Sequence, residues 1–164
     1  PLRSSAASDV YKRQDYLSKK FKVPLNVLGY SMGGLYVTNI INRNPYIFDK
    51  VVLLNPVVDS MALFSNKLLM DELWIHANNI LSLNAPEIYK DEISYIVNDL
   101  NPISFVERLK SNIIIIQSTN DEVLDPKLAK KFYNLLNSKK SYYEITNKMH
   151  DLNGDEKELL VITN

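Results

Sequence analysis

The sequence contains no cysteine and only two histidines among its 164 residues. Without cysteine, the chain can form no disulfide, use no thiol nucleophile and build no zinc–thiolate site. Two histidines are too few for a histidine-rich metal centre. We therefore expect neither a metal ion nor any other cofactor.

The chain also lacks an excess of charge of either sign and any long apolar run. The 19 lysines and arginines equal the 19 aspartates and glutamates, so nothing predicts electrostatic capture of nucleic acid or of an anionic membrane. No apolar run approaches the ~20 residues that a membrane span requires. No signal peptide is visible, and we predict a cytoplasmic location. The sequence gives no indication of the oligomeric state.

The composition is that of one ordinary globular domain. Hydrophobic residues make up 46% of the chain and charged residues 23%, which is enough for a single buried core. Residues 1–14 differ, because they are polar, rich in small side chains and without periodicity. They also resemble translated sequencing-adapter sequence. We interpret residues 1–14 as a disordered, non-native leader and residues 15–164 as the folded domain.

A Gly-x-Ser-x-Gly motif at residues 29–33 is the most informative stretch of the chain. A short apolar run at 24–28 is typical of a buried strand, and the apolar residues at 35–41 have helical spacing. A strand that turns sharply into a helix, with serine at the apex, is the nucleophile elbow. Ser31 is therefore our candidate nucleophile.

The residue types around Ser31 fit this interpretation. We expect side chains at Gly29 and Gly33 to collide where the strand and helix cross, so that both positions require glycine. Ser31 also precedes a helix, whose free N–H groups favour developing negative charge. The N–H of Met32 is our candidate oxyanion donor.

The rest of the chain predicts a mostly parallel sheet flanked by helices. Four consecutive isoleucines at 113–116 indicate a strand that is buried on both faces, which is typical of parallel sheets. Asp125 is suited to cap a helix whose first residue is Pro126. Further strands are expected within 48–56 and at 141–146, and further helices at 15–21, 104–109 and 156–162.

We interpret residues 57–101 as an insertion between two strands of the sheet. Apolar side chains recur there at helical spacing, which predicts amphipathic helices in the position of a cap or lid. These apolar residues could line an acyl pocket or simply pack on the body of the domain.

Three polar residues far apart in sequence are expected at one edge of this sheet. Ser31 follows the first strand, Asp121 follows the isoleucine strand and His150 follows the last strand. Because loops at the carboxyl ends of parallel strands converge, a nucleophile, an acid and a base would meet there in the order Ser, Asp, His. The sequence therefore predicts a catalytic triad.

Each partner of Ser31 has an alternative. His76, within the insertion, is the only other histidine that could act as the base. Asp59, which follows the second strand, and Asp125, which is better explained as a helix cap, are alternative acids. Asp151 is adjacent to His150 and is poorly placed to orient its ring.

From residue 15 onward, the chain resembles the C-terminal portion of an α/β-hydrolase. The branch it resembles most is the group of monoglyceride lipases, lysophospholipases and serine aminopeptidase-like proteins. The residues that carry the resemblance are Gly-Tyr-Ser-Met-Gly-Gly at 29–34, Ser-Thr-Asn-Asp-Glu-Val at 118–123 with Pro126, and Met149 with His150.

This resemblance implies Ser31 as the nucleophile, His150 as general base and then acid, and Asp121 as the residue that orients the imidazole. We predict small carboxylic esters as substrates, and the apolar insertion favours lipid-like or medium acyl groups. Peptidase, thioesterase and acyltransferase activities stay open, because the fold does not fix the function. Such hydrolases usually have further strands before the elbow, and a loop there carries a second oxyanion donor. Since this chain lacks that part, the sequence leaves a second hypothesis open, a weakly active or non-catalytic scaffold.

Overall fold

The computed structural model describes residues 16, 20, 25–66 and 98–152. The predicted leader at 1–14, the central part of the insertion at 67–97 with His76, and the predicted helix at 156–162 lie outside these residues.

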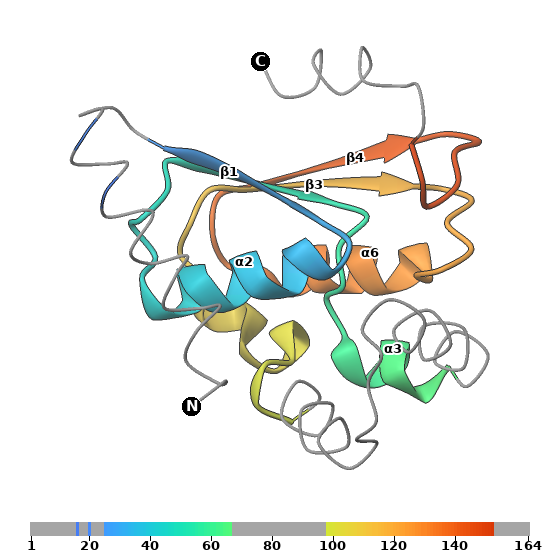
Figure 1. Ribbon diagram of the computed structural model, residues 1–164, viewed down its shortest axis with the longest axis horizontal. Helices are drawn as coiled ribbons and strands as arrows, with labels where there is room; N and C mark the ends of the chain where they lie inside the picture. Colours follow the sequence, from blue (N-terminus) through green and yellow to red (C-terminus); the bar gives the residue numbers. More distant parts are fainter. Residues whose placement is uncertain (1–15, 17–19, 21–24, 67–97, 153–164) are drawn as a thin grey trace, which may run out of the picture.

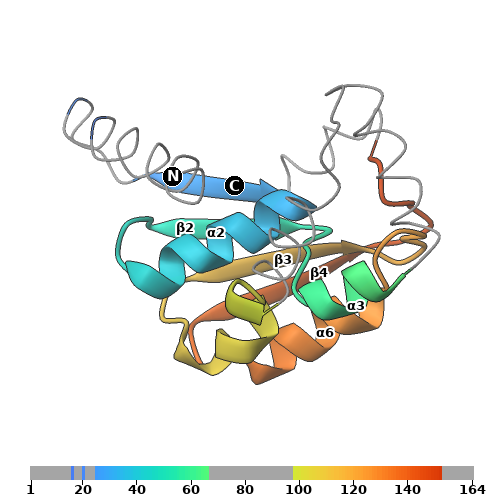
Figure 2. The same ribbon diagram turned by 60° about the horizontal axis from the view of Figure 1, so that its bottom comes forward.

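One sheet of four parallel strands forms the centre of the domain, in the order β1-β2-β3-β4 (Figure 2). The strands are β1 (Asn26–Tyr30), β2 (Lys50–Leu54), β3 (Ile113–Ser118) and β4 (Lys140–Ile145). All four strands were predicted, and the expected parallel sheet is confirmed. β1 extends beyond the apolar run at 24–28 and ends at Tyr30, the residue before Ser31.

The strand register brings the carboxyl ends of all four strands to one edge. Tyr30 pairs with Leu54, and Leu54 pairs with Ile116. One strand further, Ser118 pairs with Ile145. The loops that follow the strands therefore leave the sheet side by side, and polar residues on these loops can meet.

Helices cover one face of this sheet (Figure 1). α2 (Met32–Arg43) follows β1, and α6 (Pro126–Leu135) begins at Pro126 with Asp125 as its N-cap, as predicted. The short α3 (Ser60–Ser65) follows β2. The helix expected at 104–109 is the 3₁₀ helix η2 (Pro102–Arg108) instead, a form common in short connecting helices.

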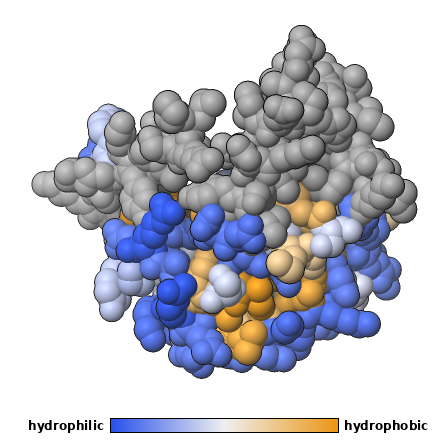
Figure 3. Space-filling view, turned by 90° about the horizontal axis from the view of Figure 1, so that it is seen from below, coloured by the Kyte–Doolittle hydropathy of each residue, from blue (hydrophilic) through white to orange (hydrophobic). Residues whose placement is uncertain are grey.

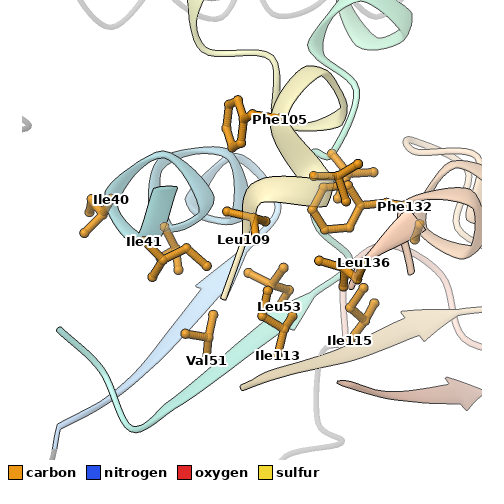
Figure 4. Close-up of a cluster of buried hydrophobic side chains, with 14 of the residues drawn as sticks. Ile40, Ile41, Val51, Leu53, Phe105, Leu109, Ile113, Ile115, Phe132 and Leu136 are labelled. Carbon is orange, nitrogen blue, oxygen red and sulfur yellow. The ribbon is translucent and has the colours of Figure 1, made fainter. Parts of the chain in front are cut away.

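The main core lies between the sheet and these helices (Figure 4). Val51 and Leu53 of β2 and Ile113 and Ile115 of β3 point toward the helices, where Phe132 of α6 is fully buried. On the opposite face of the sheet, Val52 and Leu54 of β2 pack with Ile116 of β3 and Ile145 of β4 in a second cluster. β2 and β3 are thus buried on both faces, which the isoleucine run predicted for β3.

Seen from the helix side, the described surface is mainly hydrophilic around a smaller hydrophobic area (Figure 3). β1 and β4 are the two edge strands among the described residues, and Leu28 on β1 is 51% exposed. In the part of the chain that the structure describes, no helix has the length and apolarity needed to cross a membrane.

Candidate active site

Ser31 lies at the sharp turn between β1 and α2, in a backbone conformation that L-residues rarely adopt. Its φ is 52° and its ψ is −119°, and such strain persists only where the surroundings enforce it. Three backbone hydrogen bonds do so. The Ser31 N–H donates to the carbonyl of Leu54 at 3.0 Å, and the Ser31 carbonyl accepts from the N–H groups of Gly34 and Val57, each at 2.9 Å.

Close packing at the turn explains two of its three glycines. A Cβ at Gly29 would lie 2.8 Å from the carbonyl oxygen of Gly33, as predicted. A Cβ at Gly33 would meet no atom within 4 Å, so the prediction that this position collides is wrong. The second collision is at Gly34 instead, where a Cβ would lie 2.6 Å from Cβ of Pro56. α2 therefore closely approaches both β1, at Gly29, and the loop after β2, at Gly34.

A matched pair of glycine substitutions tests this packing. Gly34→Ala forces α2 away from Pro56, and we expect it to lower the free energy of unfolding by about 1–3 kcal/mol, the usual cost of overpacking. Gly33→Ala meets open space within a helix and should raise stability by up to about 1 kcal/mol. Urea unfolding of both variants measures the difference. Equal destabilisation by the two substitutions would contradict this account.

His150, on the loop after β4, bridges the other two predicted residues. Its Nε2 lies 2.9 Å from Oγ of Ser31. Its Nδ1 lies 3.0 Å and 2.9 Å from the two carboxylate oxygens of Asp121. His150 and Asp121 are both buried. The structure therefore brings together all three residues that the sequence singled out.

Asp121 is held as a carboxylate on the loop after β3. Its Oδ1 accepts from the N–H groups of Val123 at 3.0 Å and Leu124 at 2.8 Å, and its Oδ2 accepts from Nε2 of Gln117 at 3.1 Å. Burial alone would raise the pKa of this carboxyl, but the hydrogen bonds from His150 and the backbone outweigh it, so the pKa is lowered.

The ionised carboxylate fixes the tautomer of His150. A carboxylate can only accept hydrogen bonds, so Nδ1 of the imidazole carries the proton that lies between them. In the neutral imidazole, Nε2 is then unprotonated and can accept the proton of the Ser31 hydroxyl. This is the arrangement in which an imidazole acts as a general base toward a serine.

Asn55 supports His150 and was not predicted from the sequence. It follows β2 with a φ of 40° and is fully buried. Its Nδ2 donates to the carbonyl of His150 at 2.8 Å, while its Oδ1 accepts from the N–H of Ser118 at 2.7 Å. Asparagine tolerates positive φ better than most residues, so an asparagine directly after a buried strand was the available signal.

The alternative acids have other partners. Asp59 is the N-cap of α3 and accepts from the N–H of Ala62 at 3.2 Å. Asp125 caps α6 by accepting from the N–H of Lys127 at 2.9 Å. His76, the alternative base, lies outside the described residues.

Met32, the candidate oxyanion donor, is the first residue of α2, and N–H groups of a first turn have no partner within the helix. Within the described ranges, no group of three or more His, Asp or Glu side chains could hold a metal ion.

Several solved structures share the fold of this chain. A monoacylglycerol lipase from Paleococcus ferrophilus superposes with a TM-score of 0.63 at 17% identity, covering 96% of this chain and 74% of that one. MGS-MChE2, an α/β-hydrolase enzyme from the sediment metagenome of the Mar Chica lagoon in Morocco, gives 0.68 at 20% identity, covering 99% and 73%. An acylaminoacyl peptidase from Pyrococcus horikoshii gives 0.66 at 13% identity, covering 90% and 24%. The chain has part of the α/β-hydrolase fold, as its sequence predicted.

One protein family matches most of the chain. The model of the prolyl oligopeptidase family matches residues 4–151. The chain therefore belongs to the prolyl oligopeptidase family of α/β-hydrolases. Among curated proteins, no sequence matches it significantly.

Proposed function

We propose that the protein is a serine hydrolase that cleaves carboxylic esters with lipid-like or medium acyl groups. The observation that carries this proposal is the continuous chain of contacts from Asp121 through His150 to Ser31, with a hydrogen-bonding distance at each nitrogen of the imidazole. Ser31 is the nucleophile, His150 the general base and acid, and Asp121 the residue that orients the imidazole.

Acylation begins when the Ser31 Oγ attacks the carbonyl carbon of the ester. Nε2 of His150 takes the hydroxyl proton as the new C–O bond forms, and the imidazolium is stabilised by the Asp121 carboxylate. The carbonyl oxygen becomes an oxyanion, which the N–H of Met32 and the N-terminus of α2 stabilise. His150 then returns the proton to the leaving alkoxide, and the C–O bond to the alcohol breaks.

Deacylation repeats these steps with water as the nucleophile. His150 takes a proton from the water as its oxygen attacks the acyl-enzyme carbonyl. Collapse of the second tetrahedral intermediate breaks the bond to Ser31, whose oxygen regains the proton from His150. The acid product leaves, and the site returns to its starting state.

Peptide amides are the second candidate substrate class. Membership of the prolyl oligopeptidase family favours this class, and so does the likeness to an acylaminoacyl peptidase. The same residues serve either reaction, because His150 would protonate an amine leaving group as it does an alkoxide. Fold alone does not decide between the two substrate classes.

A fluorophosphonate that labels activated serines tests the proposal without knowledge of the substrate. We expect the intact mass of the wild type to rise by one adduct, as Ser31 attacks phosphorus and fluoride leaves. Ser31→Ala and His150→Ala should show no adduct. Ser65→Ala is the matched control, since Ser65 lies on the surface of α3, and it should label like the wild type.

Two results would overturn the proposal. A folded wild type that forms no adduct would favour the non-catalytic scaffold, and an adduct that persists in Ser31→Ala would place the reactive group elsewhere. If Ser31 labels, kcat/KM for p-nitrophenyl esters of increasing acyl length, compared with aminoacyl p-nitroanilides, decides between the ester and the amide.

A further inference from the structure

The sequence neighbours of Ser31 and His150 contact each other. Tyr30, the last residue of β1, precedes Ser31, and Asp151 follows His150. The Tyr30 hydroxyl lies 2.6 Å from Oδ1 of Asp151. We propose that Tyr30 and Asp151 are positioning residues, which form a second link between β1 and the His150 loop and hold the imidazole in line with Ser31.

The hydroxyl of Tyr30 has one proton and two oxygen atoms within reach. Besides Asp151, the carbonyl oxygen of His150 lies 3.1 Å away. Because a carboxylate accepts more strongly than a carbonyl and lies closer, the main hydrogen bond goes to Asp151. Burial, this hydrogen bond and the nearby carboxylates raise the pKa of Tyr30, so the phenol remains a donor at neutral pH.

The ring of Tyr30 also packs on the imidazole. The two ring centroids are 5.4 Å apart and their planes differ by 29°, which is a stacked arrangement. A stacked neighbour restricts tilting of the imidazole out of the line between Ser31 and Asp121. Tyr30 therefore restrains both the backbone and the ring of the same residue.

The other contacts of the His150 loop lead to different elements. The N–H of His150 donates to Oε2 of Glu122 at 2.9 Å, and the N–H of Asn120 donates to the carbonyl of Lys148 at 3.0 Å. Both tie the loop to the segment that contains Asp121, and Asn55 ties it to β2. Tyr30 connects the loop to the strand that precedes Ser31. The Tyr30–Asp151 link should therefore control the Ser31–His150 distance more than the His150–Asp121 distance.

Kinetics of four variants test this role, which rests on the proposed function for its effect on turnover. We expect Tyr30→Phe and Asp151→Ala each to lower kcat about tenfold, the order of one lost charge-assisted hydrogen bond, with KM changed less than about twofold. Because both remove the same link, the double variant should be no slower than either single variant. Asp151→Asn keeps an oxygen acceptor for the phenol and should restore most of kcat.

Tyr46→Phe and Asp49→Ala are the matched controls. Both residues are exposed and lie before β2, at the opposite edge of the sheet from Ser31. We expect both controls to keep wild-type kcat and a melting temperature similar to that of the Tyr30 and Asp151 variants. Fully additive losses in the double variant, or the same loss in Asp151→Asn as in Asp151→Ala, would overturn the proposal.

A nuclear magnetic resonance measurement separates this inference from the proposed function. In a His76→Gln background, His150 is the only histidine, and the ¹⁵N shift of its Nε2 reports whether that atom accepts a hydrogen bond. We expect Tyr30→Phe and Asp151→Ala to move this shift toward that of a free imidazole nitrogen, while the Nδ1–H signal stays. An unchanged Nε2 shift in both variants overturns the inference, whether or not the wild type hydrolyses a substrate.

Discussion

Ser31→Ala is expected to reduce kcat/KM by about 10⁵–10⁶, the loss seen when the nucleophile of a serine triad is removed. His150→Ala should cost about as much, and the double variant should be no worse, because in the proposed mechanism the two residues act together through the 2.9 Å contact between Nε2 and Oγ. Steady-state kinetics on the best ester or amide substrate measures all three variants.

Ser65→Ala again serves as the control, with an expected change of less than about twofold, which is within the usual range for surface positions. Circular dichroism would verify that each variant is folded. Residual activity of Ser31→Ala above roughly 1% of the wild type, in a sample free of contaminating hydrolase, would contradict the assignment of the nucleophile, since the oxyanion site and binding alone account for far less.

The meeting of Ser31, Asp121 and His150 could be predicted from sequence because each residue has a strong local signal. Each one follows a run of residues that the sequence predicts as a strand. Parallel pairing then brings the three strand ends to one edge, where the register of Tyr30 with Leu54 and of Ser118 with Ile145 aligns the loops. Local pattern and topology therefore suffice to place the three residues, whereas their chemical roles remain predictions until measured.

The wrong predictions concern features that depend on packing between segments far apart in the chain. Which glycine of the turn must lack a Cβ depends on the distance between α2 and Pro56, and this distance is set by the position of β2. The sequence indicated Gly33, whereas the structure identifies Gly34. The end of β1 at Tyr30 depends likewise on pairing with β2 and not on the apolar run of its own sequence.

The supporting contacts of His150 could not be predicted for a related reason. Asp151 is poorly placed to orient the imidazole directly, yet its carboxylate accepts a hydrogen bond from the hydroxyl of Tyr30 on β1. Asn55, directly after β2, donates a hydrogen bond to the His150 carbonyl. Both contacts join residues far apart in the chain, and neither residue belongs to a motif. Such polar contacts follow from the assembled sheet edge and have no periodic signature in sequence.

Asp121→Asn is expected to lower kcat by about 10⁴, because it reverses the tautomer of His150. It should also lower the free energy of unfolding by about 1–3 kcal/mol, because Nε2 of Gln117 loses its acceptor at Oδ2. The backbone N–H groups of Val123 and Leu124 both donate to Oδ1, so an asparagine keeps its oxygen at that position. Its amide nitrogen then takes the place of Oδ2 and donates to Nδ1 of the imidazole. The proton moves to Nε2, which can no longer accept from Ser31.

Asp125→Asn tests whether the loss at Asp121 reflects this tautomer and not the removal of a nearby charge. Asp125 lies on the same loop and caps α6, and asparagine caps a helix about as well as aspartate. We therefore expect Asp125→Asn to retain kcat within about twofold, since a change at the surface is usually small. The ¹⁵N spectrum of His150 gives the direct readout, because Asp121→Asn should transfer the ring proton from Nδ1 to Nε2 while Asp125→Asn leaves it on Nδ1. A fully active Asp121→Asn variant, or one in which Nδ1 keeps its proton, would show that another group orients the imidazole.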